Sequence, residues 1–329
     1  MTVANKEAEK LAEIIDQLRN EDTRWDAIVK LRDMDFSNSI SVLTPYLKDR
    51  DWVVRWIIAE KCGEWGDDTV AQDLIRLLQD RDFHVRQNAS KAIVRLGVSA
   101  IPSLVADLLS MDNEMRRQVS KILIKMGDRA IPYLEDLFDE QNWLVSNRIL
   151  DVIWRINSSA AEDALIRAVA RPVCQKNAIA LLAEMKSARA VRTFIRHFET
   201  PNIRQVILTA VRKIGLEKAG PILVKAVLDS DPLLRDHSEI LIQRLGDEMI
   251  PHIKVGIVAT ASTEARLLQL LQKISPNRFL TNLISILTQS PHLKPTMLTE
   301  IGAGPFAQLV SELSQHPNIW DKLKHQSFL

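Results

Sequence analysis

A short pattern recurs along the chain with a period of about 30 residues. An Asp or Asn is followed four positions later by an Arg, then by apolar residues at helical spacing, a Gly and, in several copies, a Pro. Arg55, Arg86 and Arg116 are 31 and 30 residues apart, and Gly97 and Gly127 are 30 apart. Such a period is typical of stacked supersecondary units, each of which buries its apolar face against its neighbours. We therefore expect a repeat protein that binds its partners through an extended surface.

Each copy of the pattern contains one amphipathic helix. We call its first core residue position 0; core residues follow at positions +4, +7, +8 and +11, which form one stripe at 3.6 residues per turn. Position 0 is occupied in successive copies by Val54, Val85, Met115, Val145, Cys174, Ile203 and Leu234.

The ends of these helices carry capping residues. Three positions before position 0 stands a side chain that can accept hydrogen bonds from the first turn: Asn20, Asp51, Asp82, Asp112, Asn142, Thr200 or Asp231. Twelve positions after it stands a Gly suited to a left-handed helix end: Gly66, Gly97, Gly127, Gly215 or Gly246. Pro102, Pro132, Pro221 and Pro251 are expected to open the next helix.

The pattern resembles the HEAT family, in the short form found in phycobilisome-lyase-like repeats. The residues that carry the resemblance are Asp51, Val54 and Arg55, Asp82, Val85 and Arg86, Asp112, Met115 and Arg116, and Asp231, Leu234 and Arg235. The resemblance implies an all-α fold: an α-solenoid, built as a right-handed superhelix of about nine two-helix repeats of roughly 30 residues.

The domain prediction is a single HEAT-like α-solenoid over residues 1–329. Within it, residues 1–48 form an N-terminal cap and first repeat, 49–254 the regular repeats, and 255–329 degenerate repeats and a C-terminal cap. No linker rich in Pro, Gly or Ser interrupts the sequence.

The charge balance argues against a dedicated nucleic-acid binder. The chain has 43 Lys and Arg against 42 Asp and Glu, a net charge of +1, whereas such proteins carry a clear basic excess. The longest uncharged stretch, residues 279–293, is shorter than a membrane span. With a charged start and no apolar signal region, the protein is expected to be cytoplasmic.

The sequence contains no recognisable catalytic or metal-binding constellation. The seven His residues are scattered without the spacing of metal ligands, and none is followed by Glu. HEAT-like deoxyhypusine hydroxylases hold iron with His-Glu pairs, so the resemblance does not extend to that enzyme. Cys62 and Cys174 fall on core positions four repeats apart, too far for a disulfide. We predict no catalytic residues, no metal and no cofactor, and we assign the recurrent Asp and Arg to structure.

The candidate binding face lies opposite the core stripe of the second helices, which in HEAT arrays lines the concave surface. Positions +2, +6, +9 and +10 point that way. The predicted partner-binding residues there are Trp56, Lys91, Val94, Arg95, Arg117, Lys121, Ile124, Lys125, Trp154 and Arg155. Apolar anchors flanked by Arg and Lys are typical of binding hot spots. An alternative is that adjacent helices cover the apolar members of this set.

Three functions remain open on this basis. The first is a non-catalytic scaffold that binds an acidic or amphipathic segment of a protein partner. The second, from the repeat resemblance, is a bilin-lyase-like protein that handles a chromophore. The third is a DNA-binding protein similar to the HEAT-like alkylpurine glycosylases, with the near-zero net charge against it.

Overall fold

The computed structural model of the chain describes residues 3–35, 40–66, 68–108, 112–138, 142–259 and 264–289, with isolated positions 307, 310, 311 and 314. Within these residues all regular secondary structure is helical, so the predicted all-α solenoid of paired helices is confirmed. Much of the predicted C-terminal cap lies outside the described residues. The contacts fall into two compact units, Met1–Ala164 and Leu165–Leu329. The predicted single domain over 1–329 therefore stays a prediction.

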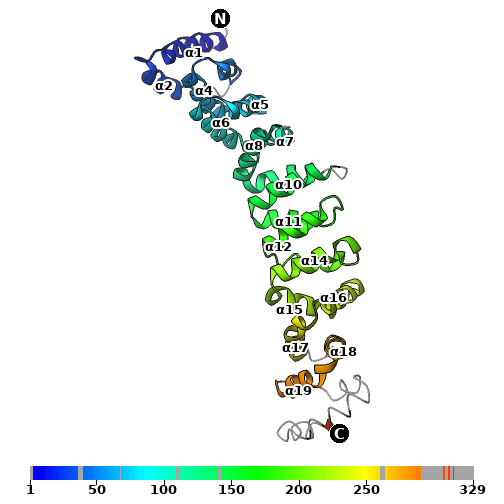
Figure 1. Cartoon of the computed structure of the whole chain (residues 1–329). Coiled ribbons are helices and arrows are strands. Elements are labelled where there is room, and N and C mark those ends of the chain that lie inside the picture. The colour runs from blue at the N-terminus through cyan, green and yellow to red at the C-terminus, as the bar shows by residue number, and fades with distance from the viewer. Residues whose placement is uncertain are drawn as a thin grey trace. The chain divides into compact units, whose positions relative to one another are not determined.

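The N-terminal unit alternates first and second helices, and after the first pair the second helix of each pair is the longer one (Figure 1). Its second helices are α2 (Arg24–Arg32), α4 (Trp52–Trp65), α6 (Phe83–Leu96), α8 (Asn113–Met126) and α10 (Trp143–Ile156). Its first helices are α1 (Val3–Arg19), α3 (Ile40–Leu43) with η1 (Thr44–Lys48), α5 (Asp68–Arg76) with η2 (Leu77–Gln79), η3 (Gly97–Ala100) with α7 (Ile101–Leu108), and η4 (Gly127–Ala130) with α9 (Ile131–Glu135). Helix α11 (Ser159–Ala168) contains the boundary between the units.

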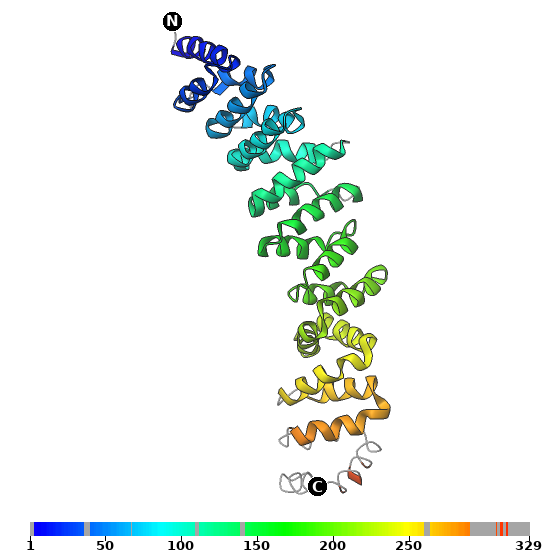
Figure 2. The ribbon, with the colours of Figure 1, turned by 60° about the vertical axis from the view of Figure 1, so that its left-hand side comes forward.

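The C-terminal unit repeats the same alternation (Figure 2). Its second helices are α12 (Gln175–Glu184), α14 (Pro201–Ile214), α16 (Pro232–Leu245) and α18 (Glu264–Ile274). The first helices are α13 (Val191–His197), α15 (Leu216–Val227), η5 (Gly246–Met249) with α17 (Ile250–Ala259), and η6 (Pro276–Arg278) with α19 (Phe279–Gln289).

The core stripe of the second helices is mostly buried, as the periodicity predicts, although Trp65 at position +11 of α4 is 41% exposed. In α6, Val85, Ala89, Ala92 and Ile93 are all buried. Helices α4 and α6 approach closely at Gly63, where an added Cβ would lie 2.5 Å from Ala92 Cα. A larger residue at Gly63 would therefore push the two helices apart.

One core position of α4 holds a lysine. Lys61, at position +7, is 2% exposed, and its Nζ donates to the carbonyl oxygens of Arg32 (2.5 Å) and Met34 (3.3 Å) and to Glu64 (3.0 Å). The last carbonyls of a helix lack intrahelical partners and carry partial negative charge, so a buried ammonium is well placed there. Lys61 thus caps the end of α2 and joins it to α4.

The recurrent Asp and Arg are structural, as predicted. Asp51 and Asp82 accept from the amides of Val53 and His84 at 2.8 Å, at the starts of α4 and α6. The Arg at position +1 donates to the carbonyl six residues earlier, at 2.7 to 3.1 Å. This bond recurs at Arg24, Arg55, Arg86, Arg204 and Arg235.

Two of the predicted caps behave differently. The side chain of Thr200 makes no capping hydrogen bond at α14. Asn20 accepts from the Asp22 amide (3.0 Å) in the turn before α2, which starts only at Arg24. In the first repeat the chain therefore makes a turn where the regular pattern predicts the first helical residues.

The predicted left-handed glycines are correct for four of five positions. Gly97, Gly127, Gly215 and Gly246 have φ of 65°, 63°, 99° and 66°. Gly66 is the exception, with φ of −77°: it continues into extended backbone after α4 instead of a 3₁₀ turn. Where the repeats lack Gly, Asn157 and Lys186 take the same place, each with φ of 53°.

The proline prediction is correct in three cases of four. Pro102, Pro132 and Pro251 each stand at the second residue of α7, α9 and α17. Pro221 instead lies inside α15, because that helix starts directly after Gly215.

One helical stretch, Phe83–Leu108, has the length and apolar composition of a membrane span. It comprises α6, η3 and α7, and the chain changes direction at Gly97, whose φ is positive. Its apolar side chains Val85, Ile93, Ile101 and Leu104 are buried in the N-terminal unit. The composition of this stretch is therefore explained by the solenoid core.

The backbone at Lys186 predicts a stabilising substitution. A non-glycine residue at positive φ costs about 1–2 kcal/mol, part of which is offset by the flexibility of Gly in the unfolded chain. We expect Lys186→Gly to raise the free energy of unfolding by about 0.5–1 kcal/mol in urea denaturation. The control Lys176→Gly, inside α12, should lower it by about 1 kcal/mol. A destabilised Lys186→Gly variant would contradict the assignment of strain.

The Arg55–Asp80 pair between neighbouring repeats predicts a pH-dependent stability. Arg55 Nε and Nη2 donate to the Asp80 carboxylate at 2.7 and 2.8 Å. Burial opposes ionisation of Asp80, but the bonds from Arg55 and from the Asp82 amide outweigh it, and the pKa of Asp80 is lowered. This stabilisation is present above the unfolded-state pKa of about 3.9 and is lost as the pH falls through the lower folded-state pKa.

Asp80→Asn keeps the acceptor for the Asp82 amide and removes the charge that faces Arg55. We expect it to lower the free energy of unfolding by about 1.5–3 kcal/mol at pH 7. The difference from wild type should shrink as the pH falls below the unfolded-state pKa of about 3.9. Urea denaturation at pH 7 and at a pH below that pKa measures the difference in free energy of unfolding. The exposed Asp128→Asn variant serves as control. A difference that is the same at both pH values would show that the ion pair does not stabilise the fold.

Candidate functional site

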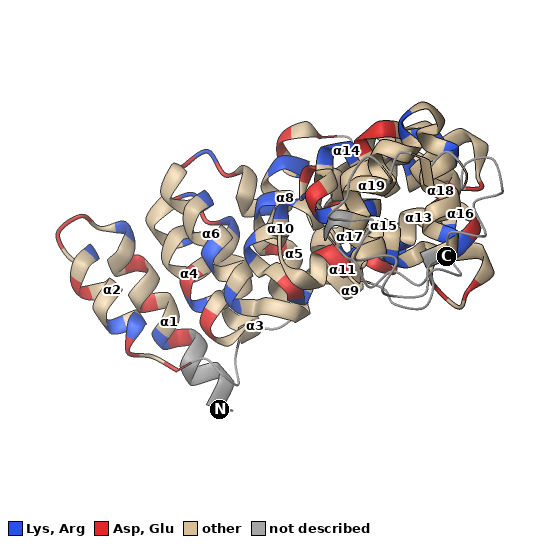
Figure 3. Ribbon diagram, turned by 90° about the horizontal axis from the view of Figure 1, so that it is seen from below, with Lys and Arg blue, Asp and Glu red and all other residues tan. Residues whose placement is uncertain are grey.

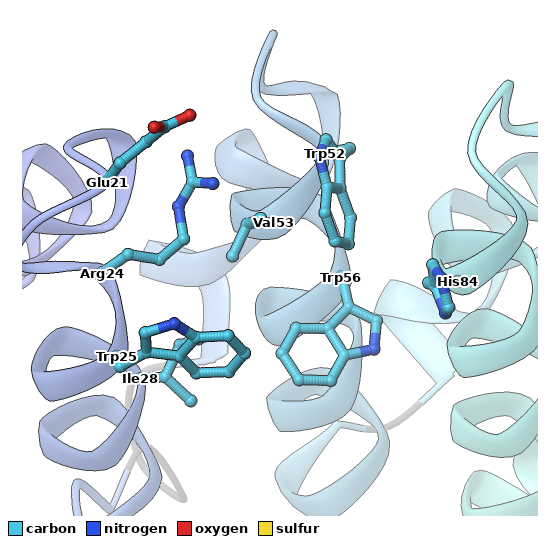
Figure 4. A pocket seen from close by; sticks show the side chains of 8 residues that line it. All are labelled: Glu21, Arg24, Trp25, Ile28, Trp52, Val53, Trp56 and His84. Atoms are coloured by element: carbon cyan, nitrogen blue, oxygen red, sulfur yellow. The ribbon is translucent and has the colours of Figure 1, made fainter.

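A hollow of about 480 Å³ opens among the second helices of the N-terminal unit. Figure 4 shows the side chains that line it: Glu21, Arg24, Trp25, Ile28, Trp52, Val53, Trp56 and His84. We call it the tryptophan hollow. In Figure 4 the rings of Trp25 and Trp56 extend toward each other from α2 and α4, and Trp52 stands beside them.

The repeat register brings these aromatic residues together. If the pattern is extended back from Asn20, position 0 of the first repeat is Thr23, which places Trp25 and Trp56 at the same position +2. Trp52 is at position −2 of the next repeat, and His84 is at position −1 of the repeat after that. Three successive repeats therefore each contribute part of the site.

Polar contacts hold the walls of the hollow. Arg24 donates to Asp51 (3.0 Å) and to the Leu18 carbonyl (2.9 Å), which joins α2 to the start of α4. Arg32 is paired with Glu60 (2.9 and 3.2 Å) and lies 5.6 Å above the Trp56 ring. The ion pair with Glu60 thus holds Arg32 in a cation–π contact with the Trp56 ring.

The other two indoles are more exposed. Trp25 is 73% exposed, and Trp52 is exposed with its ring centroid 5.7 Å from that of His84. Large aromatic side chains left in water on a rigid helical surface are typical anchors for a binding partner. Sequence reasoning missed Trp25 and Trp52, although the shared position +2 of Trp25 and Trp56 could have identified the first.

A second hollow, of about 400 Å³, lies between α8 and α10. We call it the arginine hollow. It is lined by Leu108, Asn113, Arg116, Arg117, Ser120, Leu144, Asn147, Arg148 and Asp151. The lining positions of α8 and α10 largely match those that α2 and α4 contribute to the tryptophan hollow, three repeats earlier.

The ten predicted partner-binding residues are only partly brought together. Trp56 lines the tryptophan hollow and Arg117 the arginine hollow. The six basic residues are all exposed, whereas the four apolar ones are half-buried. Half-burial shows that neighbouring side chains cover Val94, Ile124 and Trp154 in part. Ion pairs join Arg95 to Glu64 (3.7 Å), Arg117 to Glu114 (2.8 Å) and Arg155 to Asp151 (2.9 Å).

Neither a metal-binding cluster nor a reactive thiol is found among the described residues. Among them, no group of three or more His, Cys, Asp or Glu could hold a metal ion. Burial raises the pKa of the Cys62 thiol to about 12 and also raises the pKa of Cys174. A thiol that stays protonated is a poor nucleophile, and both cysteines are free and buried in the core.

Comparisons with known proteins bear on the fold. Residues 8–83 and 40–111 match the family model of HEAT repeats. No curated protein matches the sequence. An engineered protein of known structure is 14% identical, with 92% of this chain and 98% of that chain covered and a TM-score of 0.31.

Two natural proteins of known structure are similarly distant. Human deoxyhypusine hydroxylase in complex with glycerol is 17% identical, with 73% and 96% covered and a TM-score of 0.30. The complex of CpcE and CpcF of phycocyanin lyase from Nostoc sp. PCC7120 is 16% identical, with 80% and 98% covered and a TM-score of 0.24. Similarity at this level carries no information on function. The matched repeats, together with the 30-residue period and the paired helices, show that residues 8–111 of this chain are built from HEAT repeats.

Proposed function

We propose that the protein is a non-catalytic scaffold that binds a segment of a partner protein on the second-helix face of its N-terminal unit. The observation that carries this proposal is the tryptophan hollow, with Trp25 left 73% exposed beside Trp52 and Trp56. Burying such side chains against a partner removes a large apolar area from water.

The surface beyond the tryptophan hollow extends the proposed site along α6 and α8. Lys91, Lys121 and Lys125 are exposed there and form no ion pair with another described residue. These ammonium groups would attract carboxylates of a bound segment. A surface that joins aromatic anchors to unpaired cations supports an amphipathic protein segment as the occupant.

The charge pattern favours a protein partner over duplex DNA. Three of the six basic residues predicted for this face, Arg95, Arg117 and Arg155, are already paired with carboxylates of the chain. Paired arginines contribute less to the release of counterions on which affinity for phosphate depends. The chromophore-binding alternative stays an expectation from the sequence, since no contact in the described region favours a tetrapyrrole.

Substitution of Trp25 tests this proposal with a matched control. Because Trp25 is mostly exposed, Trp25→Ala should change the free energy of unfolding by no more than about 0.5 kcal/mol. It should abolish enrichment of peptides from a random 14-residue display library selected on the full-length wild-type protein. Trp65→Ala removes an indole that is 41% exposed at the other end of α4 and should leave the enrichment unchanged.

Two results would contradict the proposal. If the same peptides are enriched on wild type and on Trp25→Ala, the tryptophan hollow is not the binding site. If no peptides are enriched on the wild-type protein, the scaffold proposal fails as a whole.

A further inference from the structure

We infer that the bound segment is bipolar. A Lys or Arg side chain of the partner enters the tryptophan hollow, and an Asp or Glu side chain about eight residues away enters the arginine hollow. This inference rests on the proposed function and adds to it the charge, order and spacing of the residues that are recognised.

The uncompensated charge of the tryptophan hollow is negative. Its one guanidinium, Arg24, is neutralised by Asp51 at 3.0 Å. The lining carboxylate Glu21 forms no ion pair with another described residue. Asp22 and Asp26, exposed on either side of Trp25, likewise have carboxylates without an ion pair in this part of the chain. The acidic start of α2 is visible in red in Figure 3.

Aromatic faces beside a carboxylate favour a cationic side chain. A Lys or Arg stem can pack on the indoles of Trp25 and Trp56 while its charged end reaches Glu21. The protein already places one cation this way, since Arg32 lies 5.6 Å above the Trp56 ring. That guanidinium forms its ion pair with Glu60, so it does not neutralise the carboxylate of Glu21.

The arginine hollow has the opposite balance. Its one carboxylate, Asp151, is paired with Arg155 at 2.9 Å, and Arg117 is paired with Glu114. Arg148 is half-buried and forms no ion pair with a described residue. A guanidinium recognises a carboxylate with two parallel hydrogen bonds, so this hollow suits an Asp or Glu side chain.

The repeat register sets the distance between the two hollows. They occupy corresponding positions three repeats apart, from α2 to α8 and from α4 to α10. Three steps between packed helices of about 8–10 Å each give about 24–30 Å. An extended segment rises about 3.3 Å per residue, so about seven to nine residues separate the two charges.

Sequencing of the enriched library peptides tests this inference. Peptides whose enrichment requires Trp25 should carry Lys or Arg at one position and Asp or Glu seven to nine positions away. For such a peptide, Glu21→Gln and Arg148→Gln should each weaken binding about fivefold in fluorescence anisotropy, as expected for loss of a partly exposed ion pair. Glu217→Gln and Arg244→Gln, exposed residues of the C-terminal unit, serve as matched controls and should have no effect.

A charge exchange provides the strictest check. Glu21→Lys should abolish binding of the selected peptide, and replacing the peptide's Lys or Arg by Glu should restore it. If Trp25-dependent peptides carry only apolar or acidic residues, or charges without the seven-to-nine spacing, the bipolar inference is overturned while the scaffold proposal stands. If no enrichment depends on Trp25, the bipolar inference fails together with the assignment of the binding site to the tryptophan hollow.

Discussion

The bond from the Arg at position +1 to the carbonyl six residues earlier is the contact on which the regularity of the structure depends. It ties the first turn of a second helix to the end of the preceding first helix, and the nearby Asp caps that same turn. In Arg55 the same guanidinium also reaches Asp80 of the next repeat. One side chain thereby fixes both the turn within a repeat and the step to its neighbour. The bond to the carbonyl recurs at Arg24, Arg86, Arg204 and Arg235, so the second helices that carry it start in the same way.

Because the second helices share a register, residues at the same position of adjacent repeats lie next to one another on the surface. In both hollows, position +2 of one repeat lies beside positions −1 and +2 of the next, although the residues at these positions differ. Tryptophan at these places in the first two repeats forms the tryptophan hollow, whereas Arg117 and Asn147 at the same places form part of the arginine hollow. The core stripe can thus stay constant while the chemistry of the surface changes along the unit.

The period, the caps and the core stripe are local in sequence, which is why the fold could be predicted from them. Exposure of individual surface residues could not, because it depends on how closely adjacent helices approach. Gly63 against Ala92 brings α4 and α6 together, and no sequence period encodes that distance. Trp25 escaped prediction because α2 starts after a turn and departs from the regular capping pattern. Lys61 was missed because a charged residue at a core position looks like an error until its carbonyl partners are known.

The charges of the N-terminal unit divide into two kinds. One kind is paired with carbonyls or carboxylates of the chain and stabilises the packing of the helices: Arg24, Arg32, Arg55 and Lys61. Glu21 and Arg148 line hollows without such partners among the described residues. Because Arg24 already joins α2 to the start of α4, a ligand that pairs with Glu21 need not bring the two helices together, which lowers the cost of binding. The unpaired carboxylate of Glu21 makes the hollow selective for a positively charged side chain, in addition to its preference for apolar surface.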